Sequence, residues 1–155
     1  NLNKSNIKPS ELFDRIQKSH QIYFKLKKLN FSTKSELSKE ETIYADVDKL
    51  ASILNNLIQN SIKFSQEKGD IELVVSREEN KHVIKVKDNG MGISKIQSKN
   101  IFEAFSDSSH GTQSEVGSGL GLWIVKVFTN LHDGKVSFES EEGKGTTFII
   151  TLPAG

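Results

Sequence analysis

Residues 47–64 read VDKLASILNNLIQNSIKF, the most strongly periodic segment of the chain. Its apolar residues recur at intervals of three and four, the spacing that places side chains on one face of an α-helix. Asp46 or Asp48 can cap this helix, because a carboxylate accepts hydrogen bonds from the N–H groups of a first turn. The segment therefore predicts an amphipathic helix. Its expected apolar stripe consists of Val47, Leu50, Ala51, Leu54, Leu57, Ile58 and Ile62.

The same helix has a polar stripe, formed by Asn56, Asn60 and Lys63 at positions i, i+4 and i+7. One interpretation is a solvated face, which is ordinary for an amphipathic helix and is favoured if the stripe is considered alone. The other is a Mg²⁺ and phosphate site. Amide oxygens are hard ligands that suit Mg²⁺, and a lysine ammonium on its long stem can reach phosphate oxygens.

The segments on either side alternate between helical and strand-like patterns. A first amphipathic helix is expected over 10–29, with Leu12, Phe13, Ile16, Tyr23 and Leu26 at helical spacing. A last helix should begin inside the glycine cluster at 117–121. Elements that segregate in this way predict an α+β fold, a two-layer sandwich whose sheet is covered on one face by helices. The expected strands are 31–37, 41–45, 71–75, 83–86, 135–140 and 146–152.

Composition limits the class of protein. A length of 155 residues suits one domain, expected here over 1–155. Without cysteine there is no disulfide scaffold and no thiolate metal site, and a cytoplasmic setting fits. A net charge of +1 implies no general attraction to nucleic acid or to acidic lipid. No apolar run exceeds four residues, so neither a membrane span nor a signal peptide is expected. Since the first residue is Asn1, we expect a piece of a longer protein.

Two glycine-containing segments follow predicted strands or begin a predicted helix. Residues 88–92 read DNGMG, which is either a plain turn or a place where Asp88 accepts a hydrogen bond from a ligand amine and the glycines admit the ligand. Residues 117–122 read GSGLGL and open a helix whose N–H groups and dipole favour an anion. A hinge for the preceding loop is the alternative. This segment is not a P-loop, because no Lys-Ser or Lys-Thr follows.

In their order along the chain, these motifs resemble those of sensor histidine kinases. Residues 56–65 are similar to the N box, 88–93 to the G1 box, 101–105 to the F box and 117–122 to the G2 box; 143–148 resemble the closing strand. The resemblance covers nearly the whole chain. It implies the Bergerat ATP-binding fold, a mixed sheet backed by about three helices. ATP would lie between the helices and a mobile lid, here at about 106–116.

The resemblance also implies ATP and Mg²⁺ as ligands and a role for each matching residue. Asn60 would coordinate Mg²⁺, while Asn56 would lie beside the phosphates and Lys63 would contact them; these three are the expected catalytic residues. Asp88 would accept the adenine amino group and so favour adenine over guanine, and Thr146 could support Asp88 or a nearby water. The other residues expected to contact the nucleotide are Phe64, Gly90, Gly92, Ile93, Phe105, Gly117, Gly119, Leu120, Gly121 and Leu122.

The implied function is transfer of the ATP γ-phosphoryl group to a histidine in a two-component system. The acceptor would lie on a dimerisation domain absent from this chain, and the other expected partner is the receiver domain of a response regulator. The domain itself would be cytoplasmic and would not contact the membrane, whereas the full-length protein can be membrane-anchored. Related ATPases of the gyrase and Hsp90 type have a general-base Glu where this chain has Asn56. An amide cannot remove a proton near neutral pH, so transfer fits better than rapid hydrolysis.

The sequence also departs from the family pattern. Between Lys99 and Lys126 the only basic side chain is His110, so the expected lid has no Lys or Arg to hold the γ-phosphate. We expect it to stay comparatively mobile even with ATP bound. The phosphoacceptor box is absent, and His20, His82 and His132 are expected to be structural. Two alternatives remain: a nucleotide-binding or docking module without transferase activity, and a serine kinase of the anti-sigma-factor type.

Overall fold

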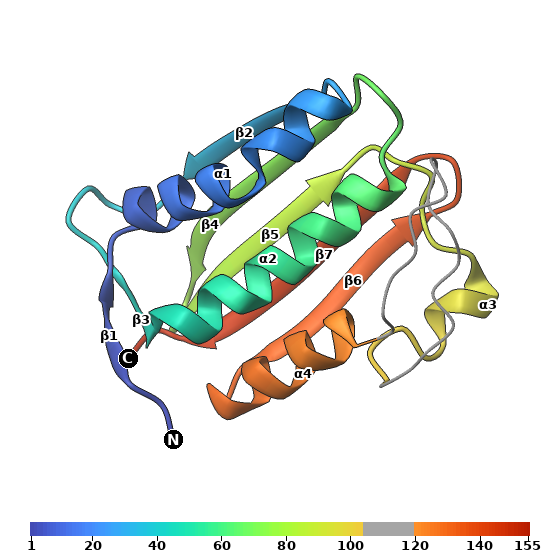
Figure 1. Cartoon of the computed structure of the whole chain (residues 1–155). Coiled ribbons are helices and arrows are strands. Elements are labelled where there is room, and N and C mark those ends of the chain that lie inside the picture. Colours follow the sequence, from blue (N-terminus) through green and yellow to red (C-terminus); the bar gives the residue numbers. More distant parts are fainter. Residues whose placement is uncertain (104–119) are drawn as a thin grey trace.

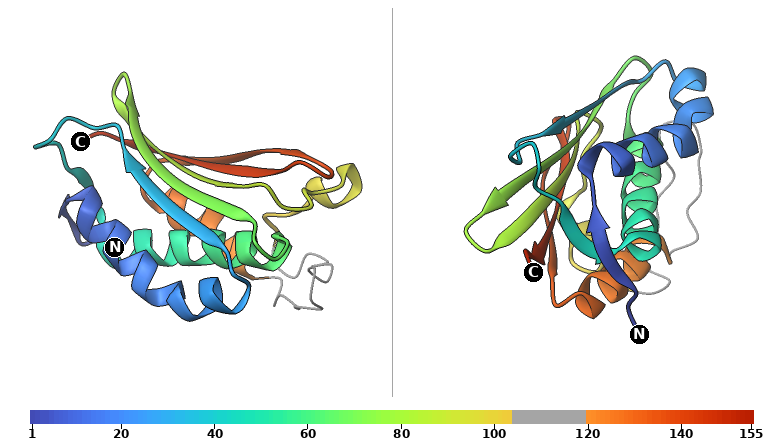
Figure 2. Two further views of the ribbon diagram at one scale, coloured as in Figure 1. Left: turned by 90° about the horizontal axis from the view of Figure 1, so that it is seen from above. Right: turned by 90° about the vertical axis from the view of Figure 1, so that its left-hand side faces the viewer.

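The chain folds into two layers, a twisted sheet and a layer of helices on one of its faces (Figures 1 and 2). The structure is a computed structural model, and it describes residues 1–103 and 120–155. Three helices, α1 (Pro9–Leu26), α2 (Val47–Phe64) and α4 (Gly121–Leu131), cover the sheet, and a short fourth helix, α3 (Lys95–Ser98), lies at one end. This arrangement confirms the predicted two-layer α+β sandwich.

The main sheet is mixed, as expected. Its five strands have the order β2-β4-β5-β7-β6; β2 is parallel to β4, and the other neighbours are antiparallel. The register places Asp88, the last residue of β5, beside Ile71 of β4 and Thr146 of β7. The strands are β2 (Asn30–Ser35), β4 (Asp70–Glu78), β5 (Lys81–Asp88), β6 (Lys135–Glu141) and β7 (Gly145–Pro153).

Helix α2 lies at the centre of the helical layer and contacts both α1 and α4. Six of its seven predicted apolar positions are buried, and Val47 is half-buried. Ile53, which lies outside the predicted stripe, is also fully buried, because α2 has a neighbouring helix on each side as well as the sheet below it. Asp46 caps the helix, its carboxylate accepting a hydrogen bond from the N–H of Lys49 at 3.1 Å. The prediction for this segment is confirmed.

A second, two-stranded sheet was not predicted. Strand β1 (Lys4–Ile7) pairs antiparallel with β3 (Ile43–Asp46), which is separate from the main sheet. Only Ile7 of β1 is buried, so its sequence, KSNI, has no alternation that periodicity could detect. The pairing brings the beginning of the chain beside the residues that precede α2.

The prediction for α1 was wrong in two respects. The helix ends at Leu26 rather than at 29, and Tyr23 and Leu26 are exposed, by 52% and 71%. Its buried face instead follows a strict spacing of four, which excludes Tyr23 and Leu26 and includes His20, the residue that was expected to be structural. The buried residues of this face are Leu12, Ile16, His20 and Phe24.

Helix α4 begins at Gly121, inside the glycine cluster, as predicted. The sequence places its apolar residues at helical spacing, but Trp123 and Leu131 are 41% and 44% exposed and the others are half-buried. These residues are Leu120, Trp123, Ile124, Val127, Phe128 and Leu131. The fully buried positions are Val125 and Thr129, which lie one turn apart. A helix packed against both α2 and β6 buries the side chains between those neighbours rather than a single stripe.

His20 predicts a pH dependence of stability. Its Nε2 donates to the amide oxygen of Asn55 at 2.9 Å, and burial lowers the pKa of the imidazole from 6.5. As pH falls below 6.5, the unfolded chain therefore binds a proton before the folded chain does, and stability is lost. We expect His20→Gln to reduce this loss, as measured by urea unfolding at pH 7 and at about pH 5. Equal losses in both proteins would contradict the assignment.

Candidate functional site

The polar stripe of α2 lies at the surface of the helical layer, beside the start of α4. Asn56, Asn60 and Lys63 are all half-buried, in contrast to the buried apolar stripe. The Asn56 side chain donates to the carbonyl of Ser52 at 2.8 Å. Its amide oxygen is directed at Gly121, where a Cβ atom would lie only 2.8 Å away. The first residue of α4 can therefore approach Asn56 closely because it is glycine.

Asp88 is buried at the end of β5, with a relative exposure of 5%. Its Oδ1 accepts from the backbone N–H of Gly90 at 2.9 Å and from that of Thr146 at 3.2 Å. These two bonds involve one carboxylate oxygen and fix the orientation of the side chain. The expectation that Thr146 supports Asp88 is correct in geometry, although the supporting group is its N–H rather than its hydroxyl.

Burial raises the pKa of Asp88 above its usual value of 3.8, because it disfavours the charged form. The N–H groups of Gly90 and Thr146 and the hydroxyl of Ser61 act in the opposite direction. Ser61 lies on α2, is fully buried, and has no hydrogen bond of ordinary length to any described residue. The acidic side chain thus lies directly under the helix that contains Asn60 and Lys63.

The glycines after Asp88 have a packing role that the sequence did not suggest. We expected Gly90 and Gly92 to leave room for a ligand. A Cβ atom at Gly90 would instead lie 2.3 Å from the carbonyl oxygen of Phe64, and one at Gly92 would lie 2.3 Å from that of Glu141. Gly92 also has φ +76°, which favours glycine. The missing side chains therefore allow protein backbone to pack against this loop.

Ser140 was missed by the sequence analysis. From β6, its hydroxyl accepts a hydrogen bond from the Ile93 N–H at 2.8 Å and bonds the Thr146 hydroxyl at the same distance. It thereby joins the loop after Asp88 to the beginning of β7. Only the register of β6 with β7, in which Ser140 faces Thr146, shows this role. A lone serine in a strand offers no pattern from which it could be inferred.

The segment that resembles the F box is partly described. Ile101 is buried, and the Phe102 ring packs edge-on against Phe138 and Phe148, with centroids 5.9 Å and 6.3 Å away. This contact anchors the segment to β6 and β7. Phe105, Gly117, Gly119 and the expected lid at 106–116 lie outside the described residues. At the other end of the lid, Leu120 and Leu122 are half-buried.

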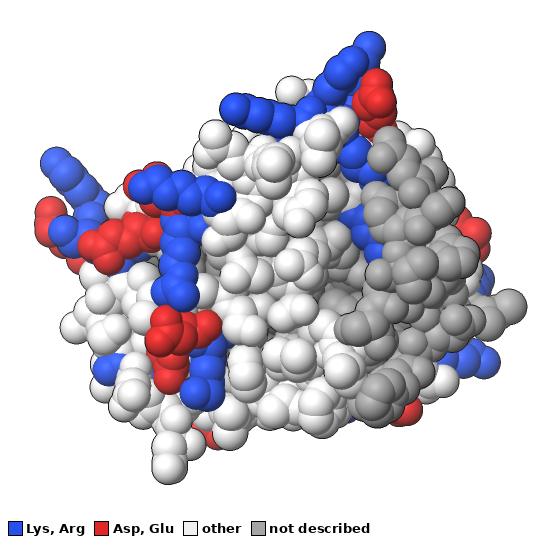
Figure 3. All heavy atoms as spheres, in the orientation of Figure 1, with Lys and Arg blue, Asp and Glu red and all other residues white. Residues whose placement is uncertain are grey.

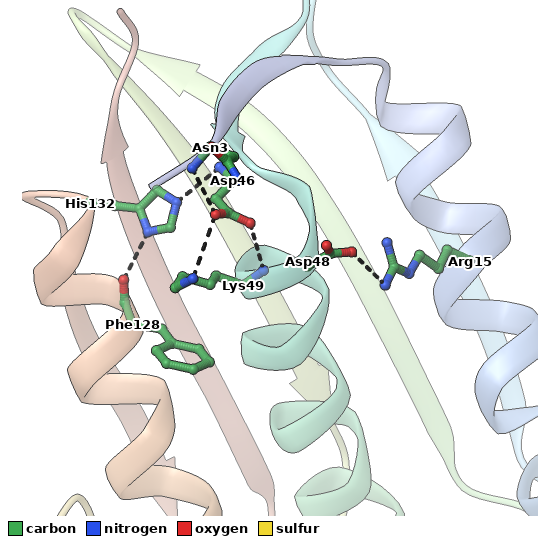
Figure 4. A network of polar contacts seen from close by, with 7 residues as sticks. All are labelled: Asn3, Arg15, Asp46, Asp48, Lys49, Phe128 and His132. Carbon is green, nitrogen blue, oxygen red and sulfur yellow. Dashed lines mark hydrogen bonds and ion pairs between the residues drawn. The ribbon is translucent and has the colours of Figure 1, made fainter. Parts of the chain in front are cut away.

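The beginning of α2 is held by the start of the chain, by the end of α4 and by α1, where Arg15 donates to Asp48 at 3.2 Å (Figure 4). The Asp46 carboxylate accepts from the Asn3 N–H at 3.0 Å. This bond and the one from the Lys49 N–H lower the pKa of Asp46. The Asp46 N–H donates to Nε2 of His132 at 3.1 Å, while Nδ1 of His132 donates to the Phe128 carbonyl at 2.8 Å. His132 is therefore a structural residue that ties the end of α4 to the start of α2.

Charged side chains are unevenly distributed over the face that carries the helices. On the face seen in Figure 1, charged side chains lie around the margins and uncharged residues cover the centre (Figure 3). The described part of the chain contains no cluster of three or more His, Asp or Glu side chains that could hold a metal. Nor does it contain a helix with the length and apolar character needed to cross a membrane.

Comparison with known proteins gives consistent matches. Residues 45–155 match the family described as histidine kinase-, DNA gyrase B- and HSP90-like ATPase. Sensor histidine kinase YclK of Bacillus subtilis is 38% identical over 157 residues, which cover 98% of this chain and 32% of YclK. Sensor protein SrrB of Staphylococcus aureus is 35% identical over 109 residues, or 70% of this chain and 19% of SrrB. The chain thus spans less than a third of the length of these relatives.

Solved structures agree with the sequence matches. The catalytic domain of histidine kinase ThkA superposes with a TM-score of 0.85 at 25% identity, over 99% of this chain and 97% of that one. Full-length ShkA in complex with AMPPNP gives 0.86 at 27% identity, over 99% of this chain and 31% of ShkA. ThkA has also been solved with the response regulator protein TrrA, where the TM-score is 0.77 at 20% identity. These matches confirm the resemblance that the five motifs indicated.

Proposed function

Because this chain belongs to the family of histidine kinase-, DNA gyrase B- and HSP90-like ATPases, we propose that it is the ATP-binding catalytic domain of a sensor histidine kinase. It would transfer the γ-phosphoryl group of ATP to a histidine on a dimerisation domain absent from this chain. The observation that supports transfer most directly is at Asn56. An amide stands there, its N–H is bonded to the Ser52 carbonyl, and its oxygen faces the start of α4.

The adenine end of the proposed site is Asp88. A buried carboxylate with Oδ1 held by two backbone N–H groups leaves Oδ2 to accept a hydrogen bond from the ligand. The adenine amino group is such a donor, whereas guanine has a carbonyl at that ring position. Buried acceptors that lose their donor are costly, so this arrangement favours ATP over GTP.

The phosphate end of the proposed site lies between α2 and α4. Leu120 has no side-chain group that can cap α4, so the N–H groups of its first turn are directed toward this end. A helix N-terminus and a lysine both favour phosphate oxygens. Gly121 and Lys63 would therefore bind the phosphates from opposite sides, with Asn56 between them.

Asn60 is the residue proposed to bind Mg²⁺, and its surroundings fit the ion. It is half-buried, and none of the described residues forms a hydrogen bond with its side-chain amide. One amide oxygen suits Mg²⁺, which takes few protein ligands and fills its remaining positions with phosphate oxygens and water. When bound, the ion neutralises charge that develops on the transferring phosphoryl group.

Catalysis by these residues would consist of positioning and electrostatic stabilisation. Asp88 and Lys63 orient the two ends of the nucleotide, so that the γ-phosphoryl group meets an acceptor in line. Asn56 cannot remove a proton from water, and we therefore expect slow ATP hydrolysis in the absence of an acceptor. A histidine acceptor needs no such base, because a neutral imidazole nitrogen has a lone pair available for attack.

The test is a transfer assay with γ-labelled ATP, Mg²⁺ and a separate dimerisation domain that contains the acceptor histidine. We expect acid-labile, base-stable label on that domain, none when its histidine is replaced by glutamine, and little free phosphate without the acceptor. Fast hydrolysis without an acceptor would favour an ATPase, and base-labile label would favour the serine kinase. Intact ATP binding with neither label nor hydrolysis would favour a docking module.

Two partners follow from this proposal. One is the dimerisation domain that presents the acceptor histidine, and the other is a response regulator that receives the phosphoryl group. ThkA, whose fold this chain shares, has been solved with the response regulator TrrA. Pull-down of a receiver domain by the full-length protein, compared with a protein that lacks this domain, would test the second partner.

A further inference from the structure

We propose that Lys27 is a positioning residue that holds the last turn of α2 and thereby places Lys63 for its contact with the phosphates. Lys27 follows α1 and does not belong to any of the motifs that resemble those of histidine kinases. The inference rests on the proposed function, because it concerns how Lys63 is placed in that site.

Lys27 is buried, with a relative exposure of only 4%. Its ammonium group donates to three carbonyl oxygens, those of Ile62 at 2.7 Å, Ser65 at 3.0 Å and Lys63 at 3.3 Å. A lysine ammonium has three N–H donors, so these carbonyls match its full donor capacity. A buried charge is stable only when it is paired or hydrogen-bonded in this way.

The three carbonyls belong to the end of α2, where the backbone most needs partners. The last four carbonyls of an α-helix have no hydrogen-bond donor within the helix, and a positive charge near that end is favourable. The N–H of the capping residue, Ser65, bonds the Ile62 carbonyl at a long 3.3 Å. From its place just after α1, Lys27 therefore supplies further donors to this end of α2.

Lys27 is itself fixed by the chain that follows α2. Its carbonyl accepts a hydrogen bond from the N–H of Lys68 at 3.1 Å. The adjoining Phe64 carbonyl accepts from the N–H of Met91, in the loop after Asp88, at 3.0 Å. The last turn of α2 is thus held by the Lys27 ammonium on one side and by the loop after Asp88 on the other.

The consequence for the site follows from the sequence position of Lys63. The Lys63 carbonyl is one of the three that Lys27 binds, and the Lys63 side chain is attached to the neighbouring Cα atom. Loss of the ammonium would leave three buried or half-buried carbonyls without this donor and would allow the last turn to unwind. The backbone to which the Lys63 side chain is attached would then no longer be held in place. Asp88, at the end of β5, would keep its position.

The test is a double-mutant cycle between Lys27→Met and Lys63→Met, with ATP affinity measured by calorimetric titration in Mg²⁺. Methionine has about the same length as lysine and lacks its donors. We expect Lys27→Met to weaken ATP binding about five- to tenfold in the parent chain and less than about twofold in the Lys63→Met chain, because residues that act as a unit are not additive. Adenosine, which has no phosphate, should bind equally to Lys27→Met and the parent chain. Lys25→Met, an exposed change in the last turn of α1, is the matched control.

The outcomes separate this inference from the proposed function. If Lys63→Met alone leaves ATP affinity unchanged, the proposed phosphate contact is wrong. If Lys63→Met weakens binding and Lys27→Met has an equal effect in both backgrounds, Lys27 is merely structural and the inference fails.

Should Lys27→Met not fold, Lys27→Arg takes its place. It keeps the charge, but its larger planar group cannot reproduce the three contacts, so the same dependence on Lys63 is expected. Unchanged ATP affinity in Lys27→Arg would overturn the inference.

Discussion

Asn60→Ala is expected to lower the rate of phosphotransfer about 100- to 1,000-fold, the usual effect of removing one group that stabilises transition-state charge. The residue is half-buried and lies outside the apolar stripe of α2, and its side-chain amide forms no hydrogen bond with any described residue. Its removal should therefore leave the fold intact. Urea unfolding would check stability, and labelling of a separate acceptor domain would measure transfer.

The proposed metal role makes this prediction specific. Asn60→Ala should weaken ATP binding only when Mg²⁺ is present, because the lost amide oxygen contacts the ion rather than the nucleotide. With a chelator, the variant and the parent chain should bind ATP equally. Gln59→Ala, an exposed change at the preceding position, is the matched control. Transfer at the parental rate, or an equal loss of ATP affinity with and without Mg²⁺, would show that Asn60 does not bind the metal.

Periodicity correctly predicted those parts of the fold in which apolar side chains pack against other apolar side chains. The α2 stripe was correct because a central helix packs apolar residues against a sheet, and the strand at 71–75 was correct because the side chains of β4 alternate between buried and half-buried positions. The sandwich architecture followed from these elements. By contrast, β1 has one buried residue, and the interior face of α1 contains His20. A sequence pattern cannot show that a polar residue has a partner on another element.

The candidate site was predictable to the extent that its residues are adjacent in sequence. The N-box-like stripe and Asp88 were found because each lies in a recognisable local pattern. Ser140 depends on the register of two strands, and Lys27 depends on the packing of two helices. The glycines after Asp88 show the same limit. Their spacing suggested an opening for a ligand, whereas their neighbours are carbonyls of α2 and β6.

Asp88→Asn is expected to weaken ATP binding by about 1 to 3 kcal/mol, the range for a hydrogen bond to a charged group. Asparagine can keep the carbonyl oxygen that accepts from Gly90 and Thr146, so its NH₂ group takes the position of Oδ2. A donor would then face the adenine amino group, which is itself a donor. Calorimetric titration with Mg²⁺ and ATP measures the loss. Asp14→Asn, an exposed change on α1, is a control with the same change of charge.

The same substitution is expected to stabilise the nucleotide-free fold. Burial raises the pKa of Asp88 above 3.8, so the folded chain binds its proton more tightly than the unfolded chain does. As pH rises from 3.8 through the folded pKa, the parent chain therefore loses stability on account of this carboxyl group, and at neutral pH the full cost of the buried charge is present. Asparagine removes that cost and keeps the two backbone hydrogen bonds. Urea unfolding at neutral pH should give a larger free energy of unfolding for Asp88→Asn, with the advantage shrinking as pH falls toward 3.8. A variant that is less stable at neutral pH would show that Oδ2 makes a stabilising contact in the folded chain, and that the buried charge is not held for the ligand.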